Sequence, residues 1–159
     1  MVDIYLRHIE ETDLEDYRQW ISQIRATRYL TRFYPDEFLR NQKIRSEYHV
    51  WFIIQQGRQD AGTVWIQRND ATDGTVKLSI FLNSERKFGQ RIGQTAIPQA
   101  IEKARAHLPF NRVLLNVRRN NRRAIACYQK CGFRIFQKHF KINHRFQFIR
   151  YYSMVLETG

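Results

Sequence analysis

The segment Phe88-Gly89-Gln90-Arg91-Ile92-Gly93 forms a predicted turn between a strand and a helix. The first amides of a helix have no partner within it, and the helix dipole favours an anion at that end. Glycines also let an anion approach the backbone closely. The turn could therefore bind a pyrophosphate, although two glycines at a helix start are also typical of an ordinary turn. It has neither the Gly-Lys-Ser/Thr ending of a P-loop nor the fingerprint of a dinucleotide site.

A second segment of interest extends from Asn121 to Phe133. Asn121 is a typical N-cap, and Gly132 is typical of the residue that follows a helix. Ala124 and Tyr128 follow Asn121 by three and seven residues, which places all three on one helix face. A purely structural role, with Asn121 as a cap and Tyr128 in the core, would give the same pattern.

Seven strands and about four helices are predicted to position these segments, in an α+β arrangement. β-branched and aromatic residues predict strands at Tyr5–Ile9, Tyr48–Gln55, Gly62–Gln67, Thr75–Leu82, Arg112–Val117, Phe133–Phe140 and Phe146–Leu156. Helices are predicted after a capping box at residues 12–15, at Asp36–Ser46, at Gly89–Leu108 with a kink at Pro98, and at Arg122–Cys131. The first helix buries a stripe formed by Leu14, Tyr17, Ile21 and Ile24.

The charge of the chain is concentrated in its second half. The formal net charge is +12, and residues 84–145 hold 15 basic and 2 acidic residues. We therefore expect an anionic ligand to bind the C-terminal half. The acidic cluster of Glu10, Glu11, Asp13, Glu15 and Asp16 could form a cation site for an amine, but acids at a helix N-terminus are more typical of dipole stabilisation.

Together, the two segments resemble the GNAT N-acetyltransferase superfamily. The pattern Asn-x-x-Ala-x-x-x-Tyr-x-x-x-Gly-Phe at 121–133 follows the glycine turn by about thirty residues. The turn resembles the corresponding turn in the branch containing ribosomal-protein N-terminal acetyltransferases. Residues 25–30, which follow Trp20, also resemble a segment of that branch. This resemblance implies a single domain over residues 1–159, with an acceptor-side half (1–74), a core that binds acetyl-CoA (75–133) and C-terminal strands (134–159). The implied fold is a mixed, mostly antiparallel seven-stranded sheet with a splayed strand pair that holds acetyl-CoA.

The resemblance also implies roles for particular residues. The Phe81 amide would polarise the thioester carbonyl, and the backbone of Leu82 and Asn83 would pair with the pantetheine arm. Asn121 would contact the pantetheine, and Tyr128 would be the general acid for the departing thiolate. The pyrophosphate would bind the turn that contains Phe88, through the amides of Gly89, Gln90, Arg91, Ile92 and Gly93.

Two positions of the turn depart from the family pattern Gln/Arg-x-x-Gly-x-Gly/Ala. Phe88 replaces a polar residue, and Arg91 replaces the central glycine. The guanidinium of Arg91 could bind a phosphate or crowd the loop, and the sequence leaves both possibilities open.

The implied reaction requires a proton donor and a neutral amine. Tyrosine titrates near 10 and a thiol near 8.5, so a hydrogen bond from Tyr128 to the developing thiolate is easier than full proton transfer. Arg122, Arg123 and Lys130 would favour anions nearby. No base is evident in the strand Thr75–Leu82, which favours an acceptor amine of low pKa; Glu47 and His49 are candidate bases, although surface roles are more typical of both.

The acceptor is the open question at this stage. A net charge of +12 disfavours polyamines and suits an amine on an anionic body, such as a protein N-terminus on the ribosome or an amino sugar linked to a nucleotide. A non-catalytic RNA-binding domain and an inactive relative that binds CoA are alternatives.

Other features bear on partners and location. Cys127 and Cys131 are four residues apart within a predicted helix, which disfavours a disulfide, and their spacing to His139 and His144 is too short for a zinc finger, so we expect no metal. No signal peptide or membrane span is predicted, so we expect a cytoplasmic protein. The long aromatic C-terminal strands are compatible with a homodimer.

Overall fold

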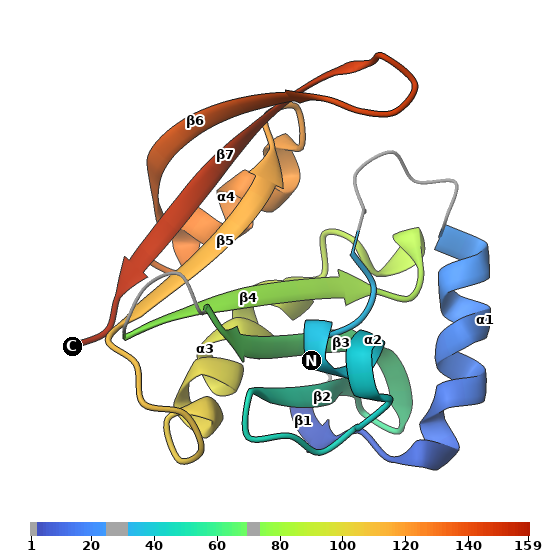
Figure 1. Ribbon diagram of the computed structural model, residues 1–159. Helices are drawn as coiled ribbons and strands as arrows, with labels where there is room; N and C mark the ends of the chain where they lie inside the picture. Colours follow the sequence, from blue (N-terminus) through green and yellow to red (C-terminus); the bar gives the residue numbers. More distant parts are fainter. Residues whose placement is uncertain (1–2, 25–31, 70–73) are drawn as a thin grey trace.

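The computed structural model describes residues 3–24, 32–69 and 74–159, which form one sheet with helices on both faces (Figure 1). The strands are β1 (Ile4–His8), β2 (His49–Gln56), β3 (Gln59–Arg68), β4 (Thr75–Leu82), β5 (Arg112–Arg118), β6 (Arg134–Ile142) and β7 (Phe148–Glu157). The helices are α1 (Leu14–Ile24), α2 (Asp36–Asn41), α3 (Ile92–Ala104) and α4 (Arg122–Lys130), with 3-10 turns η1 (Glu11–Asp13) and η2 (Glu85–Lys87). Residues 25–30, which contributed to the predicted family branch, lie outside the described residues.

The sheet order is β1-β2-β3-β4-β5-β7-β6, and all neighbours are antiparallel except β4 and β5. These two parallel strands pair only from Thr75 to Lys77 and from Arg112 to Leu114. Beyond this short ladder they separate, and Figure 1 shows β5, β6 and β7 splayed away from β1 to β4. The predicted mixed seven-stranded sheet with a splayed strand pair is confirmed.

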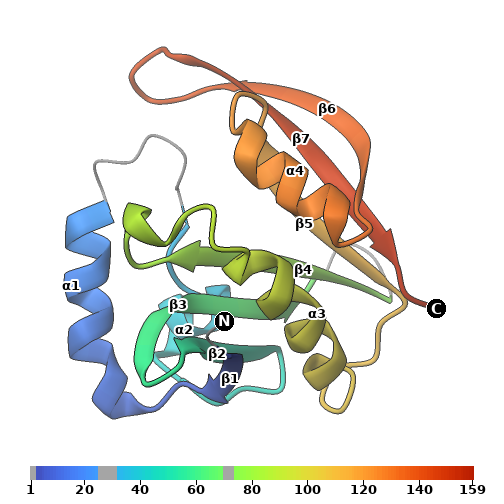
Figure 2. The same cartoon turned by 180° about the vertical axis from the view of Figure 1, so that it is seen from behind.

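Two hydrophobic cores lie on opposite faces of the sheet. One packs α3 against β1 to β5 and includes Phe52, Ile97 and Leu115. The other packs α1 and α2 against the opposite face and includes Tyr17 and Trp51. The predicted stripe of α1 is buried, with Leu14 packed at its edge. Figure 2 shows α3 and α4 together on the first face, one on each side of the gap between β4 and β5.

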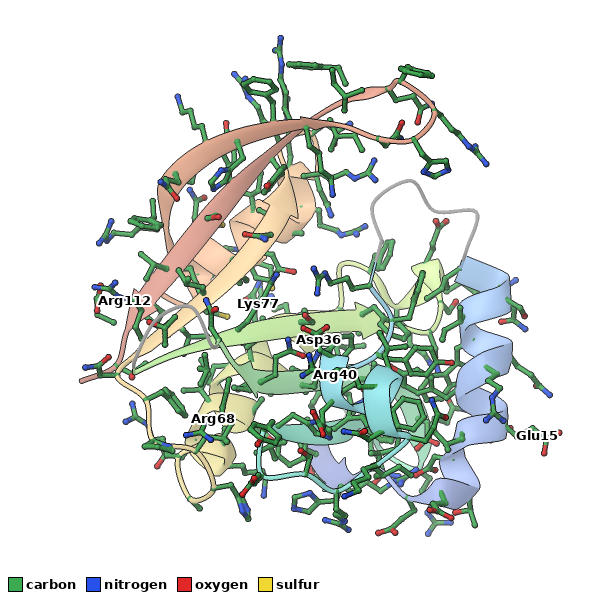
Figure 3. The ribbon with its side chains drawn as sticks, viewed as in Figure 1. Glu15, Asp36, Arg40, Arg68, Lys77 and Arg112 are labelled. Carbon is green, nitrogen blue, oxygen red and sulfur yellow. The ribbon has the colours of Figure 1, made fainter. Side chains whose placement is uncertain are left out.

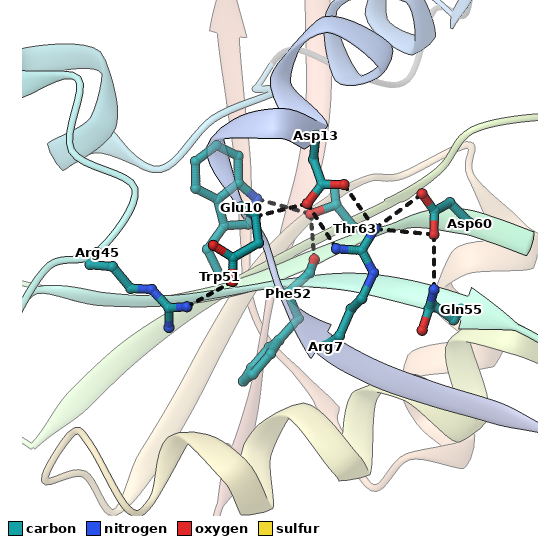
Figure 4. A network of polar contacts seen from close by, with 9 residues as sticks. All are labelled: Arg7, Glu10, Asp13, Arg45, Trp51, Phe52, Gln55, Asp60 and Thr63. Carbon is teal, nitrogen blue, oxygen red and sulfur yellow. Dashed lines mark hydrogen bonds and ion pairs between the residues drawn. The ribbon is translucent and has the colours of Figure 1, made fainter.

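The acidic residues before α1 serve mainly to fix its start. Arg7 binds Asp13 in a bidentate ion pair with both distances at 2.8 Å, and it also contacts Asp60 at 3.2 Å (Figure 4). Asp13 Oδ2 accepts a hydrogen bond from the Glu10 amide at 2.7 Å. The cap therefore joins Glu10 and Asp13, two residues earlier than the capping box predicted at residues 12–15. These contacts support a structural role over a cation site.

The segment before α3 differs from the prediction. The helix starts at Ile92 rather than Gly89, because Gly89 (φ +80°) and Arg91 (φ +61°) have left-handed backbone conformations. Pro98 lies within α3, and the helix continues through it. Proline has no N–H to donate to Gln94 O, four residues earlier. The thiol of Cys131, the residue that follows α4, lies 3.9 Å from this carbonyl and links the end of α4 to α3.

The bounds of β4 are as predicted, and most other boundaries differ from the prediction by at most three residues. The larger differences are the end of α3, at Ala104 instead of Leu108, and the end of α2, at Asn41 instead of Ser46. Gln42 ends this helix in a left-handed conformation with φ +57°. In the part of the chain that the structure describes, no helix is both long enough and apolar enough to span a membrane.

Candidate active site

A cavity of about 810 Å³ opens where β4 separates from β5. The end of β4, the start of α3 and one face of α4 form its walls. Apart from Ile24, its lining comes from the stretch between β4 and α4: Ile80, Phe81, Leu82, Glu85, Lys87, Phe88, Gly89, Arg91, Ile92, Gly93, Gln94, Ile97, Asn121, Arg123, Ala124, Ala126, Cys127, Tyr128 and Lys130. The short β4–β5 ladder thus creates the space that the two predicted segments border.

The start of α3 offers backbone donors to this cavity. The first α3 hydrogen bond runs from the Thr95 amide to Arg91 O at 3.2 Å, so the amides of Ile92, Gly93 and Gln94 precede the first helical bond. A Cβ atom on Gly89 would meet no other atom within 4 Å. Its backbone is therefore open to a ligand, and the geometry suits an anion at this end of the helix.

Phe88 and Arg123 connect the two walls of the cavity. The Arg123 guanidinium lies over the Phe88 ring, with 3.3 Å between Cζ and the ring centroid. Phe88 precedes α3, whereas Arg123 belongs to α4. The aromatic residue that departs from the family pattern thus holds a cation beside the cavity through a cation–π contact.

Gly93 and Cys127 set the spacing between α3 and α4. A Cβ atom at Gly93 would lie 3.0 Å from Cys127 Sγ, so a side chain there would crowd the thiol. Cys127 and Cys131 are free thiols. A hydrogen bond from Cys131 lowers the pKa of Cys127 and, with burial, raises the pKa of Cys131. Among the described residues, no group of three His, Cys, Asp or Glu side chains could hold a metal ion.

The register of β4 does not fit the role predicted for the Phe81 amide. Asn83 donates to Ala61 O at 2.9 Å, and the ladder aligns Phe81 with Thr63. Because N–H directions alternate along an antiparallel strand, the Phe81 amide also points toward β3. The groups directed into the gap are those of Ile80 and Leu82. The role of the Phe81 amide was implied by the family resemblance, and this register favours the neighbouring amides of Ile80 and Leu82 instead.

Two residues of the predicted set, Asn83 and Gln90, lie outside the cavity lining. Asn83 uses its amide to bind Ala61 and its side chain to bind Asp60 O at 2.8 Å. Gln90 is exposed, and its side chain bonds to Gln56 at 2.7 Å and to Arg86 O at 3.0 Å. Leu82, Phe88, Gly89, Arg91, Ile92, Gly93, Asn121 and Tyr128 all border the cavity, as does Phe81.

Asn121 and Tyr128 lie on the same face of α4, as predicted. The Asn121 side chain caps the helix by accepting a hydrogen bond from the Ala124 amide at 3.4 Å, and the same residue lines the cavity. Asn121 can therefore have both a structural and a ligand-binding role. Among the described residues, the Tyr128 hydroxyl has no hydrogen-bond partner. Burial is the main cause of a raised Tyr128 pKa, assisted by the neighbouring thiols, while Arg123 acts in the opposite direction. Burial thus outweighs the basic residues that were expected to favour anions here, and the phenol remains protonated.

A second cavity, of about 240 Å³, lies on the opposite face of the sheet. It is lined by Arg32, Lys77, Leu78, Ser79, Ile80, Asn116, Val117, Arg118, Asn121, Tyr128, Lys141, Ile149 and Tyr151. The two cavities share Ile80, Asn121 and Tyr128. Two ligands could therefore approach each other through the gap from opposite faces of the sheet, with the Tyr128 side chain at their meeting point.

Neither candidate base lies beside Tyr128. His49 is only 4 % exposed rather than superficial, and its Nε2 contacts Ile44 O at 2.8 Å. It lines a third cavity, against α2, where its buried Nδ1 has no hydrogen-bond partner among the described residues. Glu47 is exposed and lines none of these three cavities. Neither residue is therefore placed to act as a general base for the acceptor amine.

The structure adds residues that the motifs had not identified as site residues. Arg123 and Lys130 were noted only for their charge, and Ile80, Gln94 and Cys127 were not associated with the site. The spacing of Ala124, Cys127 and Tyr128 in α4 was the available signal for Cys127, because these positions share one side of the helix.

Comparisons with known proteins agree with this geometry. A model of the acetyltransferase (GNAT) domain family matches residues 3–134. A GNAT acetyltransferase from Streptococcus pneumoniae is 23 % identical with a TM-score of 0.78, covering 99 % of this chain and 100 % of its own. A spermidine N-acetyltransferase from Vibrio cholerae, solved with CoA and spermine, is 20 % identical with a TM-score of 0.78, covering 98 % and 95 %.

A putative acetyltransferase from Salmonella typhimurium, solved with acetyl-CoA, is 13 % identical with a TM-score of 0.77, covering 98 % and 94 %. Among curated proteins, no sequence matches this chain. At these identities the solved structures establish a common fold, and the family model covers most of the chain. The chain therefore belongs to the GNAT acetyltransferase family.

Proposed function

We propose that this protein transfers an acetyl group from acetyl-CoA to a primary amine by direct attack within a ternary complex. The observation that carries this proposal is the meeting of two cavities at Tyr128. The larger cavity has the α3 amides for a pyrophosphate and room for the pantetheine arm. The Vibrio cholerae and Salmonella typhimurium relatives were solved with CoA and acetyl-CoA, which supports the same ligand here.

The chemistry follows from the groups at the junction. The amine nitrogen forms a bond to the thioester carbonyl carbon, and the carbon–sulfur bond then breaks. Tyr128 donates a hydrogen bond to the departing thiolate. Backbone N–H groups of Ile80 and Leu82 face the gap and can stabilise the carbonyl oxygen. The amine releases its proton to solvent, because no carboxylate or imidazole is present among the described residues that line the acceptor-side cavity.

This lack of a base bears on the acceptor. A protein N-terminal amine, with a pKa near 7.8, is about one-seventh neutral at pH 7, whereas a lysine amine is almost entirely charged. The basic side chains of the smaller cavity lower the pKa of a bound amine further. We therefore propose a protein N-terminal amine as acceptor, in keeping with the resemblance to the ribosomal-protein branch. The basic lining also favours a second candidate, an amino sugar linked to a nucleotide.

The proposed organisation divides the site between parts of the chain. Residues 75–133 supply almost all of the cofactor-side cavity. Of the described residues that line the acceptor-side cavity, only Arg32 lies within residues 1–74, and the others come from residues 77–80, 116–128 and 141–151. We place the protein in the cytoplasm, where acetyl-CoA and nascent N-termini are available. A homodimer through the exposed aromatic residues of β6 and β7 remains part of the proposal.

Calorimetric titration with acetyl-CoA and with acetyl-dephospho-CoA tests the cofactor site. We expect micromolar binding of acetyl-CoA, weakened by loss of the 3′-phosphate and by added salt. Acetylation of N-terminal peptides, followed by mass spectrometry, then tests the transfer. Salt-sensitive RNA binding without any acetyl-CoA binding would instead support the non-catalytic alternative.

A further inference from the structure

The acceptor-side cavity is basic. Its described lining contains no carboxylate and four cationic side chains, which are those of Arg32, Lys77, Arg118 and Lys141. Lys77 belongs to β4, Arg118 to β5 and Lys141 to β6, so strands from both halves of the splayed sheet bring the charges together. Lys77 of β4 and Asp36 of α2, both labelled in Figure 3, line the third cavity together.

In the part of the chain that the structure describes, only one of the four cations forms a direct ion pair with a carboxylate. Arg32 binds Asp36 at 3.1 Å, and Asp36 also accepts from Gln67 at 2.8 Å. Lys141 contacts the Tyr151 ring, with 5.7 Å from Nζ to the centroid. Burial lowers the pKa of Lys77, and Arg32 and Lys141 lower it further, whereas Asp36 raises it. The cavity therefore holds an excess of positive charge in a partly desolvated space.

The distance between Lys77 and the junction of the two cavities can be estimated along β4. Lys77 precedes Ile80 by three residues, and a strand rises about 3.3 Å per residue, so the two positions are about 10 Å apart along β4. Ile80 borders both cavities. An anion at Lys77 and an amine beside Tyr128 are thus separated by a distance that one small molecule, or the first residues of a peptide, can span.

We propose that the acceptor carries a phosphate or carboxylate within about 10 Å of its primary amine, and that Lys77, Arg118 and Lys141 bind this anion. The inference rests on the proposed acetyl transfer and names the acceptor class for it. A polyamine such as the spermine bound by the Vibrio cholerae relative has the opposite charge and is disfavoured here. Charge-assisted hydrogen bonds to the anion would orient the amine toward the gap.

Matched acceptors with and without the anion test this proposal. The first pair is 6-aminohexyl phosphate and 6-aminohexan-1-ol, chosen because the extended phosphate compound spans about 10 Å between its amine and its phosphate. The second pair is a Ser-Asp-Glu peptide and its Ser-Asn-Gln counterpart, with blocked C-termini. We expect kcat/KM to be at least tenfold higher for the anionic member of one pair. A preference limited to the phosphate pair identifies a phosphorylated amine, and one limited to the peptide pair identifies an acidic N-terminus.

Variants then locate the preference. Lys77→Gln and Lys141→Gln should each reduce the anionic-to-neutral ratio by about tenfold. Lys138→Gln is the matched control, because it removes one charge from β6 at a residue that lines none of the three cavities. This control should retain the ratio. Equal use of both members of both pairs, or a ratio unchanged in Lys77→Gln and Lys141→Gln, would overturn the proposal.

A direct binding measurement separates failure of this inference from failure of the proposed function. Titration of 6-aminohexyl phosphate and of the acidic peptide into the CoA complex should give heat that 6-aminohexan-1-ol does not give. Acetyl transfer to neutral amines without this binding would refute only the acceptor class. Absence of acetyl-CoA binding would refute the proposed function, and the acceptor inference with it.

Discussion

Tyr128 combines three properties that a proton donor for a leaving thiolate requires. Its side chain reaches the junction of the two cavities, its hydroxyl has no partner among the described residues, and burial raises its pKa. A raised pKa makes complete proton transfer less favourable but keeps the phenol protonated at every pH where the enzyme would work. The residue therefore acts by donating a hydrogen bond.

Replacement of Tyr128 by Phe should lower kcat by tenfold to a thousandfold, because only the hydrogen-bond donor is removed. The aromatic packing against Phe133, with centroids 6.2 Å apart, would be retained, so the melting temperature should change little. Tyr34→Phe is a suitable control, since Tyr34 stacks on Phe38 and lines none of the three cavities. A wild-type rate in Tyr128→Phe would remove this residue from the mechanism.

Arg91 occupies a backbone conformation that favours glycine, with φ +61°. Arg91→Gly should therefore raise the free energy of unfolding by about 1 kcal/mol. It should also weaken acetyl-CoA binding severalfold at low salt, because a cation beside the proposed pyrophosphate site is lost. Gln42→Gly, at φ +57° and remote from this cavity, is the matched control for the backbone effect. Tighter acetyl-CoA binding by Arg91→Gly would show that the arginine crowds the loop.

At the scale of elements, the close packing of α3 on α4 determines the width of the cofactor-side cavity. Gly93→Ala would place a methyl group 3.0 Å from Cys127 Sγ and push the helices apart. We expect a loss of about 1 to 2 kcal/mol in the free energy of unfolding, together with weaker acetyl-CoA binding. Cys127→Ala removes the obstructing sulfur, so the double variant should recover most of the loss attributable to Gly93→Ala. Strictly additive effects in this cycle would contradict the contact.

The cap of α1 contributes stability that depends on pH. The hydrogen bond from Arg7 lowers the pKa of Asp13 below its ordinary value of 3.8. A carboxylate with a lowered folded-state pKa stabilises the protein above its unfolded-state pKa and loses this contribution as the pH falls through the folded-state value. Asp13→Asn should therefore cost about 1 kcal/mol at pH 7, and the difference from wild type should shrink below about pH 4. Urea unfolding across this pH range measures it; a constant difference would contradict the assignment.

The elements themselves were largely predictable from the sequence, whereas their fine geometry was not. The β-branched and aromatic residues of runs such as Tyr48–Gln55 and Thr75–Leu82 indicated strands, and Asn121 and Gly132 indicated the ends of α4. The direction of the Phe81 amide depends on its pairing with Thr63, a long-range contact that no local pattern encodes. The start of α3 depends on positive φ at Arg91, a residue type for which that conformation is uncommon.

At the scale of the whole molecule, the excess of basic residues lies near both cavities that meet at the gap between β4 and β5. The cofactor-side cavity includes Arg91, Arg123 and Lys130, and the acceptor-side cavity is basic as well. Part of the excess positive charge of the chain therefore lies beside the proposed reaction site on both faces of the sheet. Such a field attracts polyanionic ligands over distances comparable with the Debye length.

The association rate of acetyl-CoA should consequently fall by about tenfold between roughly 10 and 150 mM salt, because screening shortens the Debye length from about 30 to about 8 Å. The dissociation rate should change less, since it reflects contacts already formed within the cavity. Stopped-flow measurements can separate the two rates. Lys138→Glu and Arg145→Glu change the total charge at residues that line none of the three cavities, so they should slow association while leaving dissociation nearly unchanged. An association rate independent of salt would show that contacts within the cavity, rather than the field of the whole protein, determine capture of the cofactor.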